Sequence, residues 1–79
     1  MLSVEQIKAA RALLGWTAAD LAKKSGIGLT TLRRYEMGEG VPNANVNSLK
    51  KILNALETEG IVILGDPEID PGVQLKRRS

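Results

Sequence analysis

The sequence contains no cysteine and no histidine among its 79 residues. Disulfide bonds, thiolate or imidazole metal sites, and catalysis based on cysteine or histidine are therefore excluded. A chain of this length is close to the lower limit at which a single hydrophobic core suffices for folding. Its stability must come from close helix packing, from oligomerisation, or from both.

Long apolar runs are also missing, although 43% of the residues are hydrophobic. No stretch is long enough to span a bilayer. The opening residues, "MLSVEQIKAA", lack the cationic leader and the apolar stretch of a signal peptide. We therefore expect a cytoplasmic protein without a membrane partner. The carboxylates and lysines are scattered and form no catalytic constellation, so we expect neither enzymatic activity nor a cofactor or metal.

The charges are unevenly distributed along the chain, although the net charge is only +2. Residues 1–56 carry eight basic and four acidic side chains, whereas residues 57–75, the acidic segment, carry five acidic and no basic ones. The final "KRRS" is basic again. A basic body beside an acidic segment indicates that one surface meets a polyanion and another does not. Chance clustering on a solvated surface is the alternative.

Capping signals and apolar periodicity predict four helices. The first two helices begin at capping-box pairs and end at glycines, namely Ser3 with Gln6 before Gly15, and Thr17 with Asp20 before Gly26. A third helix is expected from about residue 28 or 29 to residue 36, closed by Gly38. After a loop around Pro42, a fourth helix ends at Gly60 and has an apolar face made of Val46, Leu49, Ile52, Leu53 and Leu56.

The pattern changes to that of β-structure after the fourth helix. Residues 61–64, "IVIL", are β-prone, and the turn formers "GDPEIDPG" separate them from the alternating "VQLK" of residues 73–76. We predict a hairpin with its loop near residues 65–72. Because a lone hairpin is marginally stable in water, it should pack on the helices or pair with another subunit. The predicted fold is mainly α, with residues 1–60 helical, a hairpin at 61–76 and a disordered tail at 77–79.

Two arginines, Arg33 and Arg34, are adjacent in the third helix, so they cannot both face a core. A helical wheel places Leu32 and Tyr35 on the inner face, and Thr30 and Arg34 side by side on the outer face. Such a face combines short donors with long cations, as a helix entering the DNA major groove requires. The alternative is that the arginine pair only makes a surface helix soluble.

A capped helix, a turn at Gly26 and a second short helix have the spacing of a helix-turn-helix. The stretch "GWTAADLAKKSGIGLTTLRRYEMGEGVP" resembles the Cro/CI-type (XRE-like) helix-turn-helix regulators. The residues that carry the resemblance are Thr17, Leu21, Ala22, Gly26, Ile27, Leu32, Glu36, Gly38 and Pro42. It covers about residues 4–57 and implies a four-helix lambda-repressor-like domain. The C-terminal hairpin looks like the ends of short phage or prophage members.

The resemblance implies a transcriptional regulator that binds double-stranded DNA as a homodimer on an inverted repeat. Its recognition helix, about residues 28–36, would enter the major groove. The implied DNA-binding residues are Thr17, Gly28, Leu29, Thr30, Thr31, Arg33 and Arg34. We expect Arg34 to contact a base edge and Arg33 to bind the phosphate backbone of the DNA. Leu29 either is half-buried or meets a thymine methyl group. Arg11 and Glu36 occupy the positions of a structural ion pair.

Some positions depart from the family pattern. Ala18 stands where a glutamine that contacts phosphate is common, so backbone N–H groups at that helix start would have to hold the phosphate. Moderate affinity per monomer would then make dimerisation necessary for useful specificity. We expect the fourth helix and the hairpin to form the dimer surface, because residues 61–64 offer more apolar surface than five short elements need. The alternative function is an antitoxin-like or anti-repressor-like interaction module, in which the acidic hairpin captures a protein partner.

Overall fold

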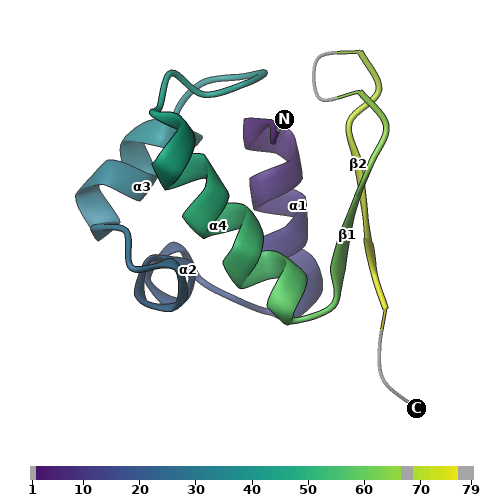
Figure 1. Cartoon of the computed structure of the whole chain (residues 1–79), viewed down its shortest axis with the longest axis horizontal. Helices are drawn as coiled ribbons and strands as arrows, with labels where there is room; N and C mark the ends of the chain where they lie inside the picture. The colour runs from purple at the N-terminus through teal and green to yellow at the C-terminus, as the bar shows by residue number, and fades with distance from the viewer. Residues whose placement is uncertain (1, 67–68, 77–79) are drawn as a thin grey trace.

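The computed structural model describes residues 2–66 and 69–76. Four helices precede a two-stranded antiparallel hairpin, which confirms the predicted fold class (Figure 1). The elements are α1 Val4–Leu14, α2 Ala18–Ser25, α3 Leu29–Glu36, α4 Val46–Thr58, β1 Ile61–Leu64 and β2 Gly72–Leu75. Within the described residues, no helix is long and apolar enough to cross a membrane. The tail predicted at 77–79 lies outside the described residues.

The first two helices begin at complete capping boxes. The Ser3 hydroxyl accepts from the Gln6 N–H, and the Gln6 carboxamide oxygen accepts from the Ser3 N–H. Thr17 and Asp20 repeat this reciprocal arrangement at the start of α2. These bonds satisfy N–H groups that a helix start leaves without an intrahelical partner. Short-range sequence signals therefore determine where α1 and α2 begin.

The later helix ends differ slightly from the predictions. Met37 caps α3 in an ordinary right-handed conformation, so Gly38 does not provide a left-handed stop. In α4, the last helical residue is Thr58, two residues before Gly60. Val46, predicted on the apolar face, is 53% exposed because it is the first residue of α4, where the chain is still leaving the α3–α4 loop.

One core joins all four helices and the first strand. Its buried side chains are Leu2, Ile7, Ala10, Leu21, Ala22, Leu32, Tyr35, Ile52, Leu56 and Ile61. Trp16 is partly buried against the same cluster, in the connection between α1 and α2. Because the core draws on each helix, the orientation of α3 depends on contacts from the whole domain.

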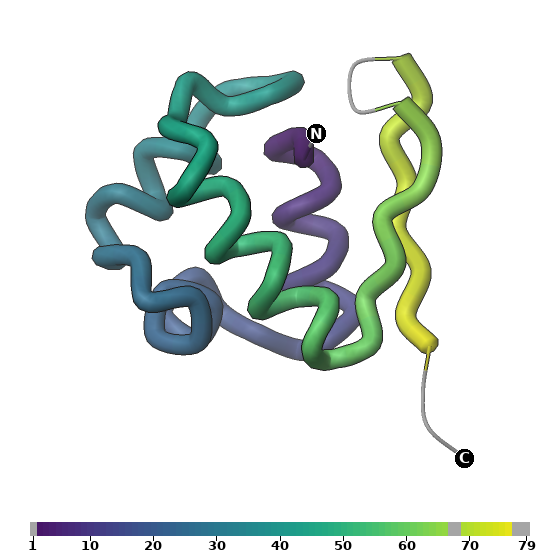
Figure 2. Tube along the Cα trace, viewed as in Figure 1, coloured from purple at the N-terminus to yellow at the C-terminus, as the bar shows by residue number. Residues whose placement is uncertain are grey.

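The hairpin packs one of its faces on the helices. The paired residues are Ile61 with Leu75, Val62 with Gln74, Ile63 with Val73, and Leu64 with Gly72. β2 therefore begins at Gly72, one residue earlier than predicted. The inner-face side chains of Ile61, Ile63, Val73 and Leu75 contact the core. The hairpin stands across α1 from α3, so it leaves α3 uncovered (Figures 1 and 2).

Gly60 connects α4 to β1 with φ of 96°. A Cβ atom at this position would collide with the backbone carbonyl oxygen of Lys76. Gly15, at the end of α1, also has a positive φ of 70°, but a Cβ atom there would meet no atom of a more distant described residue within 4 Å. A side chain at Gly15 would therefore cause backbone strain alone, whereas a side chain at Gly60 would cause backbone strain and a steric collision.

We expect Gly15→Ala to lower the free energy of unfolding by about 1–2 kcal/mol, the cost of a left-handed L-residue. Gly60→Ala should lower it by at least about 1 kcal/mol more, because the added methyl group displaces the end of β2. Urea unfolding followed by circular dichroism measures both losses. Equal losses would contradict the close approach of Gly60 to Lys76.

Candidate nucleic-acid interface

The connection between α2 and α3 is a tight turn. The N–H groups of Gly26 and Ile27 both donate to the carbonyl oxygen of Ala22, at 3.0 and 3.1 Å. Gly26 adopts the left-handed conformation, with φ of 75°, that the turn requires. Leu21 and Leu32 are fully buried between the helices. The turn and this apolar contact hold α2 and α3 in a helix-turn-helix arrangement.

The two faces of α3 differ in exposure. Leu32 and Tyr35 are buried, whereas Thr30, Arg33 and Arg34 are exposed. Thr31 is partly exposed at the edge between the faces. The structure thus brings the polar side chains that the sequence singled out onto one accessible surface. We call the exposed Thr30, Arg33 and Arg34 the α3 outer face.

Leu29 and Gly28 lie at the start of α3. Leu29 is partly buried and packs against the core, which is the first of the two alternatives for this residue. Gly28 is exposed with an ordinary φ of −62°. A Cβ atom at Gly28 would have the Thr31 hydroxyl oxygen as its nearest non-neighbouring atom, at 3.9 Å. Internal packing therefore gives no reason for glycine at this position.

Arg34 lies beside an open groove that the sequence did not predict. Its guanidinium carbon is 6.0 Å from the centre of the Tyr35 ring. The groove has a volume of about 820 Å³ and lies between the end of α3 and the α3–α4 loop. Val41, Asn43 and Asn45 contribute to its lining. Asn45 also caps α4, since its side-chain oxygen accepts from the Ser48 N–H at 2.8 Å.

Thr17 is exposed, and its hydroxyl oxygen accepts a hydrogen bond from a neighbouring residue of the same chain. That oxygen accepts from the Asp20 N–H at 3.1 Å, and the Thr17 N–H donates to the Asp20 carboxylate at 2.9 Å. Asp20 thus brings a negative charge to the start of α2.

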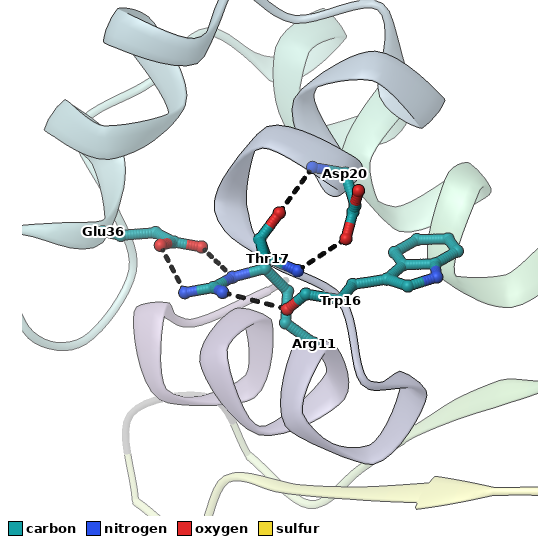
Figure 3. Close-up of polar contacts among 5 residues, drawn as sticks. All are labelled: Arg11, Trp16, Thr17, Asp20 and Glu36. Carbon is teal, nitrogen blue, oxygen red and sulfur yellow. Dashed lines mark hydrogen bonds and ion pairs between the residues drawn. The ribbon is translucent and has the colours of Figure 1, made fainter.

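Arg11 connects three parts of the domain (Figure 3). Its Nε and Nη2 atoms donate to the two carboxylate oxygens of Glu36, at 2.9 and 2.8 Å. Its Nη1 atom donates to the carbonyl oxygen of Trp16 at 3.2 Å. The Arg11 and Glu36 side chains are only 20% and 8% exposed. The expected ion pair is present, and it joins α1, the α1–α2 connection and the last residue of α3.

The comparison with known families agrees with this geometry. A helix-turn-helix family model matches residues 7–61, which is more than half of the chain. The protein therefore belongs to the helix-turn-helix family, and it is a Cro/CI (XRE)-like member, as the sequence resemblance predicted. The matched region covers most of α1 and all of α2 to α4, and it ends at the first residue of β1.

One of the proteins that the chain is similar to is a phage repressor. The chain is 40% identical over 53 residues to the cryptic phage CTXphi transcriptional repressor RstR of Vibrio cholerae serotype O1. This match covers 67% of the present chain and 46% of the relative. The chain therefore spans about half the length of the relative that it matches.

The ion pair leads to a prediction about stability. Arg11→Met should lower the free energy of unfolding by about 2–4 kcal/mol, because it leaves the Glu36 carboxylate largely buried without its partner. Arg11→Lys should recover only part of the loss, since an ammonium group cannot form the two parallel bonds. In the double variant Arg11→Met with Glu36→Leu, the loss should be smaller than the sum of the single losses. Additive losses in chemical denaturation would contradict the pairing.

The Asp20 carboxylate leads to a second prediction. The Thr17 N–H bond, helped by the Thr17 hydroxyl bond and by Lys23 and Lys24, lowers the pKa of Asp20 below its ordinary value of 3.8. A lowered pKa in the folded state stabilises the fold above the unfolded-state pKa, and this contribution is lost as pH falls through the folded-state pKa. Asp20→Asn keeps an acceptor oxygen but removes the charge.

We therefore expect Asp20→Asn to be less stable than the natural sequence at neutral pH. The difference should disappear as the pH falls below the pKa of Asp20. Unfolding free energies measured across this range, together with carboxyl titration by NMR, check the sign. A difference that stays constant down to the acid limit would contradict a charge-dependent cap.

Proposed function

We propose that this protein is a sequence-specific double-stranded DNA-binding transcriptional regulator, with α3 as its recognition helix. The observation that carries the proposal is the α3 outer face, which displays two arginines and a threonine on a helix held by a partly buried ion pair. Membership of the helix-turn-helix family and similarity to a phage repressor support it. A helix of this kind fits the major groove of B-form DNA.

The roles of the DNA-facing side chains follow from their positions on α3. Arg34 is the base reader, because it lies on the outer face and its guanidinium can bind a guanine edge through two hydrogen bonds. Its guanidinium carbon, 6.0 Å from the Tyr35 ring centre, is at the outer limit of a cation–π contact. Arg33 binds the phosphate backbone of the DNA. Thr30 and Thr31 supply short donors, and Gly28 permits close approach of a DNA strand.

We infer that the regulator acts as a symmetric dimer on an inverted repeat. Residues 1–60 form the DNA-binding unit, and the hairpin with α4 forms the dimer contact. The outward-facing Leu64 is 44% exposed, and its paired residue is Gly72, which has no side chain to cover it. In such a dimer, the half-sites lie about 34 Å apart on one face of the DNA.

A second candidate function involves a different protein as partner. Ile69 is 83% exposed near Asp66 and Asp70 in the hairpin loop, and an apolar side chain among acidic groups suits a basic, partly apolar protein surface. An antitoxin-like or anti-repressor-like module would use this surface. A stable complex with another protein, together with no mobility shift on any duplex, would favour this candidate over DNA binding.

The two arginines provide the test of the proposed function. Arg34→Ala should relax discrimination at one base pair per half-site by about 1–3 kcal/mol. Arg33→Ala should weaken binding about equally on all duplexes and reduce the slope of log affinity against log salt by about 1. Lys8→Ala on the exposed side of α1 is the matched control. Uniform weakening by Arg34→Ala would make that residue a backbone clamp instead.

A further inference from the structure

Gln6 connects α1 to both strands of the hairpin. Its side chain is buried, with 1% of the residue exposed. The amide nitrogen donates to the carbonyl oxygens of Leu64 and Gly72, at 3.0 and 3.1 Å. The amide oxygen accepts from the Ser3 N–H at 2.9 Å. Both amide hydrogens and the oxygen are therefore engaged, whereas the sequence pattern indicated only a capping role for this residue.

The two acceptors occupy opposite positions in the hairpin. Leu64 and Gly72 form the last residue pair before the loop. One amide nitrogen can reach both carbonyl groups only when these two residues face each other. We infer that Gln6 is a positioning residue, which fixes the strand register and attaches the loop end of the hairpin to the first turn of α1.

The same turn of α1 also holds the loop that follows α3. The Val4 N–H donates to the carbonyl oxygen of Gly40 at 2.8 Å, and the Glu5 carboxylate accepts from the Gly40 N–H at 3.0 Å. Residues 3–6 therefore contact the hairpin on one side and the α3–α4 loop on the other. The position of the hairpin is thereby tied to the segment that leaves the recognition helix.

This arrangement gives Gln6 a consequence for DNA binding, which rests on the proposed function. If two copies meet through their hairpins, the position of each hairpin on α1 sets the relative orientation of the two α3 helices. That orientation determines which half-site separation both helices can bind together. Gln6 then contributes to the choice of operator spacing, although it belongs to α1 and not to α3.

Replacement by glutamate separates the two roles of this side chain. Gln6→Glu keeps an oxygen for the Ser3 N–H and preserves the capping box, in which glutamate is equally suitable. It also places a carboxylate oxygen, an acceptor only, against two carbonyl oxygens. Gln6→Met removes both the cap bond and the hairpin bonds. Lys8→Gln, on the exposed side of α1, lowers the net charge by the same one unit without removing any contact of Gln6.

Residue-resolved hydrogen exchange at neutral pH tests the anchoring role. In Gln6→Glu and Gln6→Met, protection of the hairpin amides, including the Lys76 N–H, should fall about tenfold or more, as expected when buried hydrogen bonds are lost. Protection in α4 should change much less, and Lys8→Gln should resemble the natural sequence. Unchanged hairpin protection in Gln6→Glu, or an equal loss in the hairpin and α4, would overturn the inference.

Binding to duplexes with varied half-site spacing tests the consequence for DNA. The natural sequence should prefer one spacing, and Gln6→Glu should lose at least half of that preference on a logarithmic scale while still binding a single half-site. An unaltered spacing preference in Gln6→Glu would overturn the link to operator spacing. If the natural sequence binds no duplex, the proposed function fails, whereas the exchange measurement still decides the anchoring role.

Discussion

The bidentate pair between Arg11 and Glu36 is the interaction on which the geometry of the site depends. Glu36 is the last residue of α3, and its carboxylate is nearly buried. The Arg11 guanidinium neutralises that charge and also binds the Trp16 carbonyl group, so one side chain joins α1, the start of the helix-turn-helix and the end of α3. A planar group with donors in fixed directions holds these elements at a defined angle.

Much of the fold could be predicted from the sequence because its signals are local. Capping boxes and glycine stops act over three or four residues, and they identified the limits of α1 and α2. The wheel of α3 also separated Leu32 and Tyr35 from Arg34. Val46 and the start of β2 were misplaced, because the edge of the core and the strand pairing depend on residues far away in the chain.

The parts of the site that were not predicted depend on tertiary contacts. Gln6 lies 58 and 66 residues from its two hairpin acceptors, and its local spacing indicated only a cap. The groove beside Arg34 forms where the α3–α4 loop returns past the end of α3. Since α1 binds this loop through Val4 and Glu5, the surroundings of Arg34 are set by the first turn of the first helix.

Selection of bound duplexes from a random pool tests most directly whether this protein reads DNA through α3. We predict that the natural sequence enriches one palindrome, with half-sites separated by about one helical turn. Each half-site should contain a guanine whose enrichment is lost in Arg34→Ala. Enrichment of no sequence, or of an asymmetric sequence that Arg34→Ala selects equally well, would contradict a regulator that reads DNA through α3.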